Sequence, residues 1–126
     1  MSRRLNDLHA DFRPKAIELL ARLTEAGICV MIIDTLRTEE EHKANLLKGV
    51  SWIKRSKHMD GLAIDICPYS IWQLNGPDKL QWNANDPIWQ KIGEIGESLG
   101  LTWGGRWPQK DLGHFELILS PGSWNI

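Results

Sequence analysis

The sequence predicts an α+β fold in a single domain. Two segments carry apolar residues at helical spacing and end at a glycine, and another segment begins with a helix-capping pattern. Three short apolar runs, rich in β-branched residues, are typical of strands. Because these helices and strands do not alternate in a regular β–α–β order, an α+β arrangement is favoured over a parallel α/β sheet.

The N-terminal part of the chain predicts a helix followed by a buried strand. The helix is expected to begin after Asp11 as its N-cap, with Pro14 tolerated in the first turn. Gly27 ends this helix, and its apolar stripe comprises Phe12, Ala16, Leu19, Leu20 and Leu23. The fully apolar run at residues 28–33 is then expected to form a buried strand.

The central segments predict a second helix, a loop and a second strand. Thr38 and Glu41 match the capping-box pattern, and the helix that they begin is expected to end near Gly49. Residues 50–57 predict a loop, and residues 62–67 predict a strand that Pro68 ends. Residues 69–85 lack clear periodicity, which indicates an irregular segment or a hairpin.

The C-terminal part predicts one more helix and the last strand. Asp86 followed by Pro87 is typical of a helix start, because a capping side chain precedes a proline at the first helical position. Gly100 ends this helix, whose buried stripe is expected to comprise Ile88, Ile92, Ile95 and Leu99. Residues 114–119 predict the last strand.

Length, composition and charge limit the classes of function. A chain of 126 residues can bury one core but not two, and its 42% hydrophobic and 25% charged residues are ordinary for a globular protein. The net charge is −1 and no segment is strongly basic, which argues against nucleic-acid binding, because phosphate contacts need clustered Lys and Arg. The longest apolar run is too short to cross a bilayer, so we expect no membrane insertion.

The N-terminus and the cysteines indicate the compartment in which the protein is made. Residues 1–12 contain basic residues but no apolar stretch behind them, so we expect no secretory signal and synthesis in the cytoplasm. Neither Cys29 nor Cys67 sits in a CxxC pair. We interpret both as buried free thiols in a reducing compartment.

Three short segments, residues 34–38, 56–65 and 111–117, carry the residues that suggest chemistry. His58 lies in the loop that enters the second strand, Asp65 lies inside that strand, and His114 opens the last strand. Zinc accepts imidazole nitrogen and carboxylate oxygen, and a catalytic zinc site keeps one position for water. Gly61 lets the backbone turn, and the small Ala63 leaves room on the face that Asp65 shares.

Each of these residues also has an ordinary interpretation. His58 could be a surface loop residue, and His114 a hydrogen-bonded histidine at a strand end. Asp65 could be a turn or salt-bridge residue, but an acid inside an apolar strand is costly to bury unless it is paired or binds a metal. Taken alone, the three residues suggest a metal site without establishing it.

The two longest of these segments carry a family resemblance. The stretch SKHMDGLAIDICP, beginning at Ser56, resembles the SxHxxGxAxD signature of the peptidase M15 family. This family of LAS-type metallopeptidases comprises D-alanyl-D-alanine carboxypeptidases and dipeptidases, and phage endolysins that cleave L-alanyl–D-glutamate bonds. The later stretches GLTWGGRW and DLGHFEL, and the opening LNDLHADFRPKAIELLARLTEAGI, are similar to the endolysin-like branch. The resemblance implies a small antiparallel sheet packed with about three helices, as in hedgehog and D,D-peptidase domains.

The resemblance implies roles for individual residues. His58, Asp65 and His114 match the zinc ligands, and Asp111 matches the catalytic acid–base position. Arg37 matches an arginine that contacts the scissile region or a substrate carboxylate. Asp111 could instead be a solvated turn acid, and Arg37 a surface charge at the start of a helix.

Further residues are expected near the substrate. Ser56 matches the serine of the signature, which is assigned to substrate contact or support of the site. Trp103 and Trp107 line the substrate groove in one interpretation and close the core beneath the last strand in the other.

The resemblance therefore predicts a zinc-dependent peptidase acting on peptidoglycan stem peptides. The favoured hypothesis is an endolysin-type L-alanyl–D-glutamate endopeptidase. A D-alanyl-D-alanine carboxypeptidase or dipeptidase, and a non-catalytic metal-binding module on the same scaffold, remain open. We expect residues 1–126 to form one catalytic domain without a cell-wall-binding module, to act as a monomer, and to reach the cell wall after release by a holin.

Overall fold

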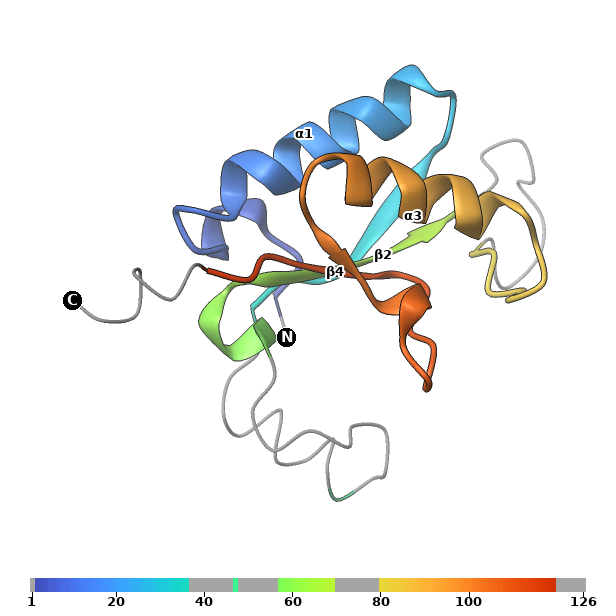
Figure 1. Cartoon of the computed structure of the whole chain (residues 1–126). Helices are drawn as coiled ribbons and strands as arrows, with labels where there is room; N and C mark the ends of the chain where they lie inside the picture. Colours follow the sequence, from blue (N-terminus) through green and yellow to red (C-terminus); the bar gives the residue numbers. More distant parts are fainter. Residues whose placement is uncertain (1, 37–46, 48–56, 70–79, 120–126) are drawn as a thin grey trace.

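The computed structural model describes residues 2–36, 47, 57–69 and 80–119. Within these ranges the chain forms a four-stranded antiparallel sheet in the order β1-β2-β4-β3. Two helices, α1 (Arg13–Glu25) and α3 (Ile88–Ser98), contact each other and lie together on one side of this sheet (Figure 1). This architecture confirms the expected α+β class.

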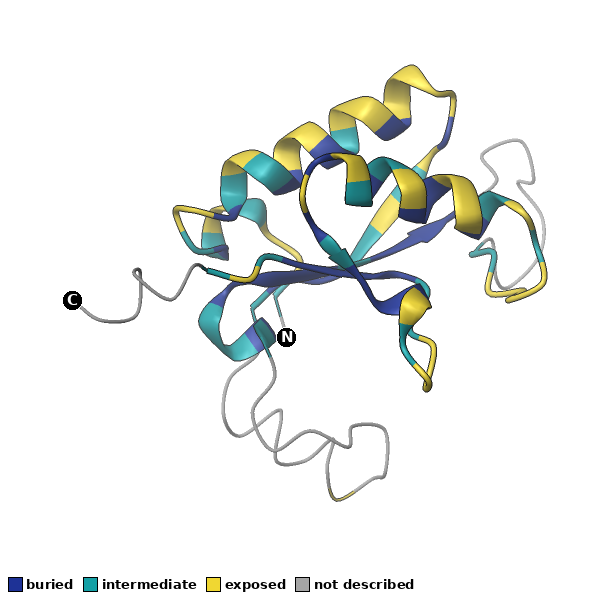
Figure 2. Ribbon diagram, in the orientation of Figure 1, coloured by how far each residue is buried: buried dark blue, intermediate teal, exposed yellow. Residues whose placement is uncertain are grey.

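Helix α1 forms where the apolar stripe predicts it. Its inward residues are buried and its outward residues are exposed (Figure 2), and the buried positions are Ala16, Leu19 and Leu23, preceded by the buried Phe12. The expected N-cap is wrong, because the helix begins at Arg13 after Phe12, without a capping side chain. Gly27 follows the helix with φ of 76°, a left-handed conformation that favours glycine.

Both central strands lie slightly further along the chain than the sequence predicts: the first starts two residues later and ends one later, and the second is shifted by one residue. Strand β1 spans Val30–Asp34 and strand β2 spans Ala63–Pro68, and they pair with Ile32 opposite Ile66 and Asp34 opposite Asp65. Cys67 is buried in β2, as expected, but Cys29 precedes β1 and is exposed. The expectation that both thiols are buried is therefore wrong for Cys29.

Helix α3 packs unusually close to the sheet. It begins at Ile88, one residue after the expected first helical position Pro87, and Asp86 Oδ1 accepts a hydrogen bond of 2.9 Å from the backbone N–H of Ile88. A Cβ added at Gly93 would lie 2.3 Å from the Trp103 ring, and one added at Gly96 would lie 2.2 Å from the Phe115 ring. The predicted stripe omitted these glycines and the buried Trp89, because a glycine has no side chain that would mark a buried face.

The last two strands complete the sheet and define its two faces. Strand β3 (Thr102–Trp103) and the 3₁₀ turn η3 (Gly104–Arg106) precede β4 (His114–Glu116), which ends three residues before the predicted end. Side chains alternate along a strand, so Ile64 and Phe115 share the face that packs against the helices. Asp65, His114 and Glu116 therefore belong to the opposite face.

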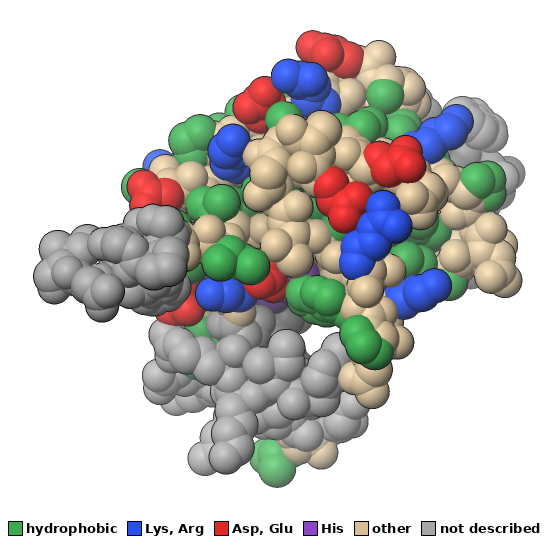
Figure 3. All heavy atoms as spheres, in the orientation of Figure 1, with side chains coloured by type: hydrophobic (Ala, Val, Ile, Leu, Met, Phe, Trp, Pro, Cys, Tyr) green, Lys and Arg blue, Asp and Glu red, His purple; other side chains and the backbone are tan. Residues whose placement is uncertain are grey.

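Other expectations concern the second helix and the surface. The helix expected from Thr38 to Gly49 falls almost entirely outside the described residues. Among the helices that the structure describes, none is long and apolar enough to cross a membrane. On the face drawn in Figure 3, acidic and basic side chains are interspersed rather than gathered by sign.

Candidate metal centre

Pairing between β2 and β4 brings Asp65 and His114 together. The two residues lie directly opposite each other in the antiparallel register, although 49 positions separate them in the chain. Directly opposed residues on one face place their side chains in contact. The Asp65 Oδ1 and His114 Nδ1 atoms are accordingly 2.9 Å apart.

The short 3₁₀ turn η2 (Lys57–Asp60) delivers His58 to the same place. Gly61 follows with φ of 71°, so the chain can reverse into β2 over three residues, and this agrees with the turn expected there. A Cβ at Gly61 would also lie 2.7 Å from the backbone nitrogen of His9. The buried His58 ring donates a hydrogen bond of 2.8 Å from Nδ1 to the carbonyl oxygen of Thr35, which turns Nε2 toward Asp65.

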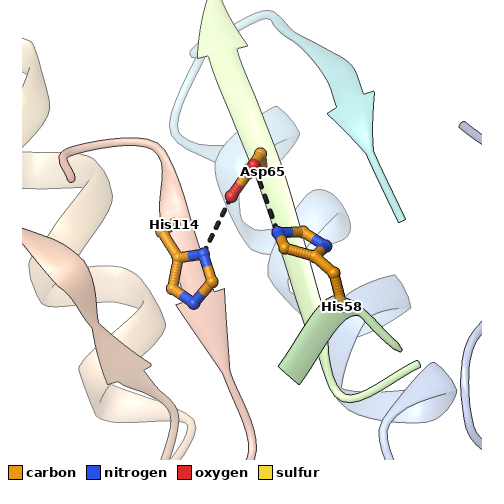
Figure 4. Close-up of side chains that lie close together, drawn as sticks. All are labelled: His58, Asp65 and His114. Atoms are coloured by element: carbon orange, nitrogen blue, oxygen red, sulfur yellow. Dashed lines mark hydrogen bonds and ion pairs between the residues drawn. The ribbon is translucent and has the colours of Figure 1, made fainter. Parts of the chain in front are cut away.

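Three donor atoms converge on one point of the sheet (Figure 4). His58 Nε2 is 3.1 Å from Asp65 Oδ2, and the donor atoms of His58, Asp65 and His114 all lie within 4.8 Å of one another. Two ligands of a tetrahedral zinc ion, each ~2.1 Å from the metal, are ~3.3 Å apart. The two imidazole contacts with Asp65 are close to this separation, and a donor set of two imidazoles and one carboxylate suits a divalent metal ion.

The ionisation of the cluster shows that it is suited to hold positive charge. Burial would raise the pKa of the Asp65 carboxyl, but hydrogen bonds with His114 and His58 outweigh burial and hold this pKa far below its ordinary value. Burial lowers the pKa of His114, whereas hydrogen bonds with Asp65 and Glu116 raise it, with a net increase to about 10. Without a metal, a proton on His114 partly balances the surrounding carboxylates.

The rim of the cluster carries an acid and an aromatic ring. The half-exposed Asp111 places Oδ2 3.8 Å from His114 Nδ1. Its backbone is held by hydrogen bonds of 3.0 Å to the Gly104 carbonyl and 3.2 Å from the His114 N–H. A Cβ at Gly104 would lie 2.5 Å from the Asp111 carbonyl oxygen, so glycine permits this approach. The Trp107 ring lies 5.1 Å from the His114 ring and walls one side.

The remaining expected site residues are placed differently. Trp103 is 3% exposed, its Nε1 donates to the Leu112 carbonyl, and its ring packs against Gly93, so of the two roles considered it has the core role in this structure. Arg37 and Ser56 lie outside the described residues.

Two partners of the histidines were missed by sequence reasoning. Thr35 acts through its backbone carbonyl, for which no residue type is diagnostic. Glu116 lies 2.8 Å from His114 Nε2 and stands in the sequence two positions after it. An acid at i+2 from a histidine in a strand shares its face, and this spacing was the available signal.

A family profile and curated relatives match this chain. The profile of a peptidase M15 family, described as D-alanyl-D-alanine carboxypeptidase, matches residues 50–117, which include the whole cluster. The chain is 31% identical over 128 residues to the peptidoglycan L-alanyl-D-glutamate endopeptidase CwlK of Bacillus subtilis, with 90% of this chain and 75% of that protein covered. It is 32% identical to the L-alanyl-D-glutamate peptidase of Escherichia phage T5, with 69% and 74% covered.

A longer phage protein and a solved structure are similar as well. The chain is 32% identical over 104 residues to the L-alanyl-D-glutamate peptidase of Listeria phage A118, but this match covers 82% of the chain and 35% of the phage protein. The crystal structure of the L-Ala D-Glu endopeptidase ChiX of Serratia marcescens superposes with a TM-score of 0.69 at 23% identity, covering 90% of this chain and 83% of that one. That likeness shows a common fold. By its profile match and its relatives, the chain belongs to the peptidase M15 family of metallopeptidases.

Proposed function

We propose that the protein is a zinc peptidase that hydrolyses the L-alanyl–D-glutamate bond in the stem peptides of peptidoglycan. The observation that carries this proposal is the convergence of His58, Asp65 and His114 on one sheet face, with the Asp111 carboxylate beside them. The bond is suggested by relatives in a bacterium and two phages that are named for the same activity.

The three converging residues would hold the metal, and each contributes a defined property. His58 offers Nε2 and His114 offers Nδ1, while Asp65 bridges the space between the rings. Two neutral ligands and one anionic ligand leave a zinc site with net positive charge. A zinc ion bound there supplies Lewis acidity, which polarises a carbonyl group and makes a water molecule more acidic.

Asp111 is proposed to carry the proton during hydrolysis. Its carboxylate accepts a proton from the attacking water and returns it to the leaving amine. The backbone hydrogen bonds with Gly104 and His114 fix the segment that bears this carboxylate, and its partial exposure leaves it accessible to substrate. A residue in this role needs freedom to face first the water and then the amine.

Three further residues are proposed to contact the substrate. Arg37 would stabilise the negative charge that develops on the scissile carbonyl oxygen, or pair with a substrate carboxylate through its planar guanidinium group. Ser56 would donate or accept a hydrogen bond at the substrate backbone. A substrate contact of Trp103 stays a prediction, and Trp107, beside His114, is better exposed for such a contact.

A second candidate is a D-alanyl-D-alanine carboxypeptidase, because the matching family profile carries that description. The two activities cut different bonds of the same stem peptide. Digestion of purified peptidoglycan, followed by mass analysis of the new termini, separates them. New N-terminal D-glutamate supports the endopeptidase, whereas release of free D-alanine alone would replace it with the carboxypeptidase.

An alternative outside the enzyme class is a metal-binding module without hydrolytic activity. A turbidity assay on peptidoglycan, with and without a chelator and paired with metal analysis, tests this alternative. Clearing that the chelator abolishes and zinc restores supports the peptidase. Stoichiometric zinc without any clearing would reject it.

The setting of the enzyme is also part of the proposal. We propose that residues 1–126 act as one catalytic domain and as a monomer, and that a holin pore gives access to the cell wall. Expression in a bacterial cytoplasm with and without a holin tests the last point. Lysis that requires both proteins is expected, and lysis without the holin would contradict it.

A further inference from the structure

Both ring nitrogens of His114 have a defined partner, and the two partners are different carboxylates. Nδ1 lies 2.9 Å from Asp65 Oδ1, and Nε2 lies 2.8 Å from Glu116 Oε1. Because the two nitrogens of an imidazole point in divergent directions, Glu116 cannot reach an ion held between Asp65 and Nδ1. Its carboxylate contacts the ring from the side away from the cluster.

We propose that Glu116 is a positioning residue of the metal centre, which fixes the orientation and tautomer of His114. As a hydrogen-bond acceptor, Glu116 keeps the proton of the neutral imidazole on Nε2 and leaves the Nδ1 lone pair for the metal. A carboxylate in this position also makes the imidazole a stronger ligand. The inference rests on the proposed metal site at His58, Asp65 and His114.

His58, the other histidine of the cluster, is arranged in the same way, except that Nδ1 meets the acceptor and Nε2 faces Asp65. The Thr35 carbonyl accepts from Nδ1 of His58 and leaves Nε2 toward Asp65. Each metal-facing nitrogen is therefore opposed, across its ring, by an acceptor at 2.8 Å. The acceptor is an uncharged carbonyl for the His58 ring and a carboxylate for the His114 ring, so only His114 contacts the side chain of Glu116 in this way.

The fold holds Glu116 firmly in this place. The residue ends β4, its side chain is 12% exposed, and its backbone pairs with Ala63 on one side and Thr102 on the other. Ala63 is the small residue directly opposite, and it leaves space on this face for the longer acid. A buried carboxylate needs a partner to offset the cost of its desolvation, and the Nε2–H of His114 provides it.

Two substitutions of Glu116 and one control separate this role from a merely structural one. Glu116→Ala removes the acceptor, whereas Glu116→Gln retains an acceptor oxygen of the same shape without the charge. Glu18→Gln is the matched control, because Glu18 is an exposed acid on α1 that pairs with Arg22. Circular dichroism of each metal-free variant checks that the fold is retained.

The first measurement is zinc affinity, by competition with a chelating dye. We expect Glu116→Ala to weaken binding by about 10- to 100-fold, Glu116→Gln to weaken it less, and Glu18→Gln to leave it unchanged. The second measurement is the imidazole ¹H–¹⁵N spectrum of the zinc-loaded protein. A slowly exchanging proton on His114 Nε2 is expected in the wild type and its loss in Glu116→Ala.

The outcomes separate this inference from the proposed peptidase activity. Unchanged zinc affinity and an unchanged Nε2 proton signal in Glu116→Ala would overturn the inference while the peptidase proposal stands. Weakened zinc affinity in a protein that cuts no peptidoglycan would support the inference and reject the peptidase. A wild type that takes up no zinc would overturn both.

Discussion

At the scale of single residues, the proposed metal centre depends on matched proton donors and acceptors around two imidazole rings. His114 lies between Asp65 and Glu116, and His58 lies between Asp65 and the Thr35 carbonyl. Asp65 therefore contacts both rings, and its hydrogen bonds with them hold its pKa far below the ordinary value despite burial. Removal of this one carboxylate would leave two imidazoles without the anionic ligand between them.

Asp111→Ala tests the proposed proton carrier. We expect it to lower peptidoglycan hydrolysis by about 10²- to 10⁴-fold, because general acid–base catalysis contributes that much, with zinc content unchanged. Turbidity and metal analysis on the same samples measure both quantities. Asp11→Ala, which removes an exposed acid before α1, is the control and should retain full activity. Normal hydrolysis by Asp111→Ala would exclude the residue from the mechanism.

The raised pKa of His114 predicts that metal binding releases a proton. The metal-free imidazole keeps its proton up to about pH 10 rather than its ordinary 6.5, and a metal on Nδ1 must displace it. Zinc affinity should therefore rise as the pH increases toward that value. Calorimetric titrations at pH 7 in two buffers of different ionisation enthalpy measure the release. A heat independent of the buffer would contradict the expected protonation.

The raised pKa of His114 has the opposite effect on the stability of the metal-free protein, which should fall rather than rise as the pH increases. A histidine whose pKa is raised on folding stabilises the native state fully below its unfolded value of 6.5 and loses this contribution as the pH rises through about 10. The metal-free protein should thus become less stable over that interval. Zinc-loaded protein, which has lost the proton, should not show this decline.

At the scale of secondary-structure elements, the close packing of α3 on the sheet depends on two glycines. The Phe115 ring packs directly against Gly96, where a side chain would overlap it. Phe115 lies between His114 and Glu116 in β4. An alanine in a helix normally stabilises it by about 1 kcal/mol relative to glycine. Here the added methyl group would overlap the ring, so the packing term opposes the helix propensity.

Gly96→Ala is therefore expected to destabilise the protein by about 1–3 kcal/mol, the usual cost of overpacking a core. Urea unfolding of the metal-free protein measures the change. Lys91→Ala, at an exposed position of the same helix, is the control and should change stability by less than about 0.5 kcal/mol. A more stable Gly96→Ala protein would show that α3 can move away from the sheet at little cost.

The elements differ in how far the sequence predicts them. Helix α1 and the Asp86 cap follow from apolar spacing and a capping side chain, which are local signals. Strand β3 has only two residues, too few for a periodic pattern, and was not predicted, whereas the last strand was predicted but ends three residues early. Helix α1 starts at Arg13 rather than after Asp11, and the residue at its N-cap position is the buried Phe12, which provides no side-chain cap.

At the scale of the whole molecule, the candidate site is a product of strand pairing. The sequence motifs identify His58, Asp65 and His114 because the family resemblance gives the spacing, and the structure brings all three together. The partners of the histidines were not predicted, because Thr35 acts through its backbone carbonyl and the i+2 spacing of Glu116 from His114 was not used. The contact between Asp65 and His114 depends on the register between β2 and β4, and local patterns carry no information on that register.

Metal should stabilise the whole fold, because the ligands come from η2, β2 and β4. A ligand at 100 times its dissociation constant adds about 2.7 kcal/mol to the free energy of unfolding. The melting temperature should therefore rise on addition of zinc and fall on addition of a chelator. Differential scanning calorimetry of wild type and His114→Ala measures this effect. An equal rise in both proteins would show that zinc binds elsewhere.

The exposure of Cys29 has a practical consequence. This thiol precedes β1 at the end that pairs with Pro68, whereas Asp34 at the other end of the strand pairs with Asp65. Asp34 lies five positions after Cys29 along extended chain, a distance of about 17 Å. Because Cys67 is buried, maleimide reagents should modify Cys29 first. The protein can thus be tethered to a bead or carry a fluorophore through its own thiol, at the end of β1 opposite to Asp34.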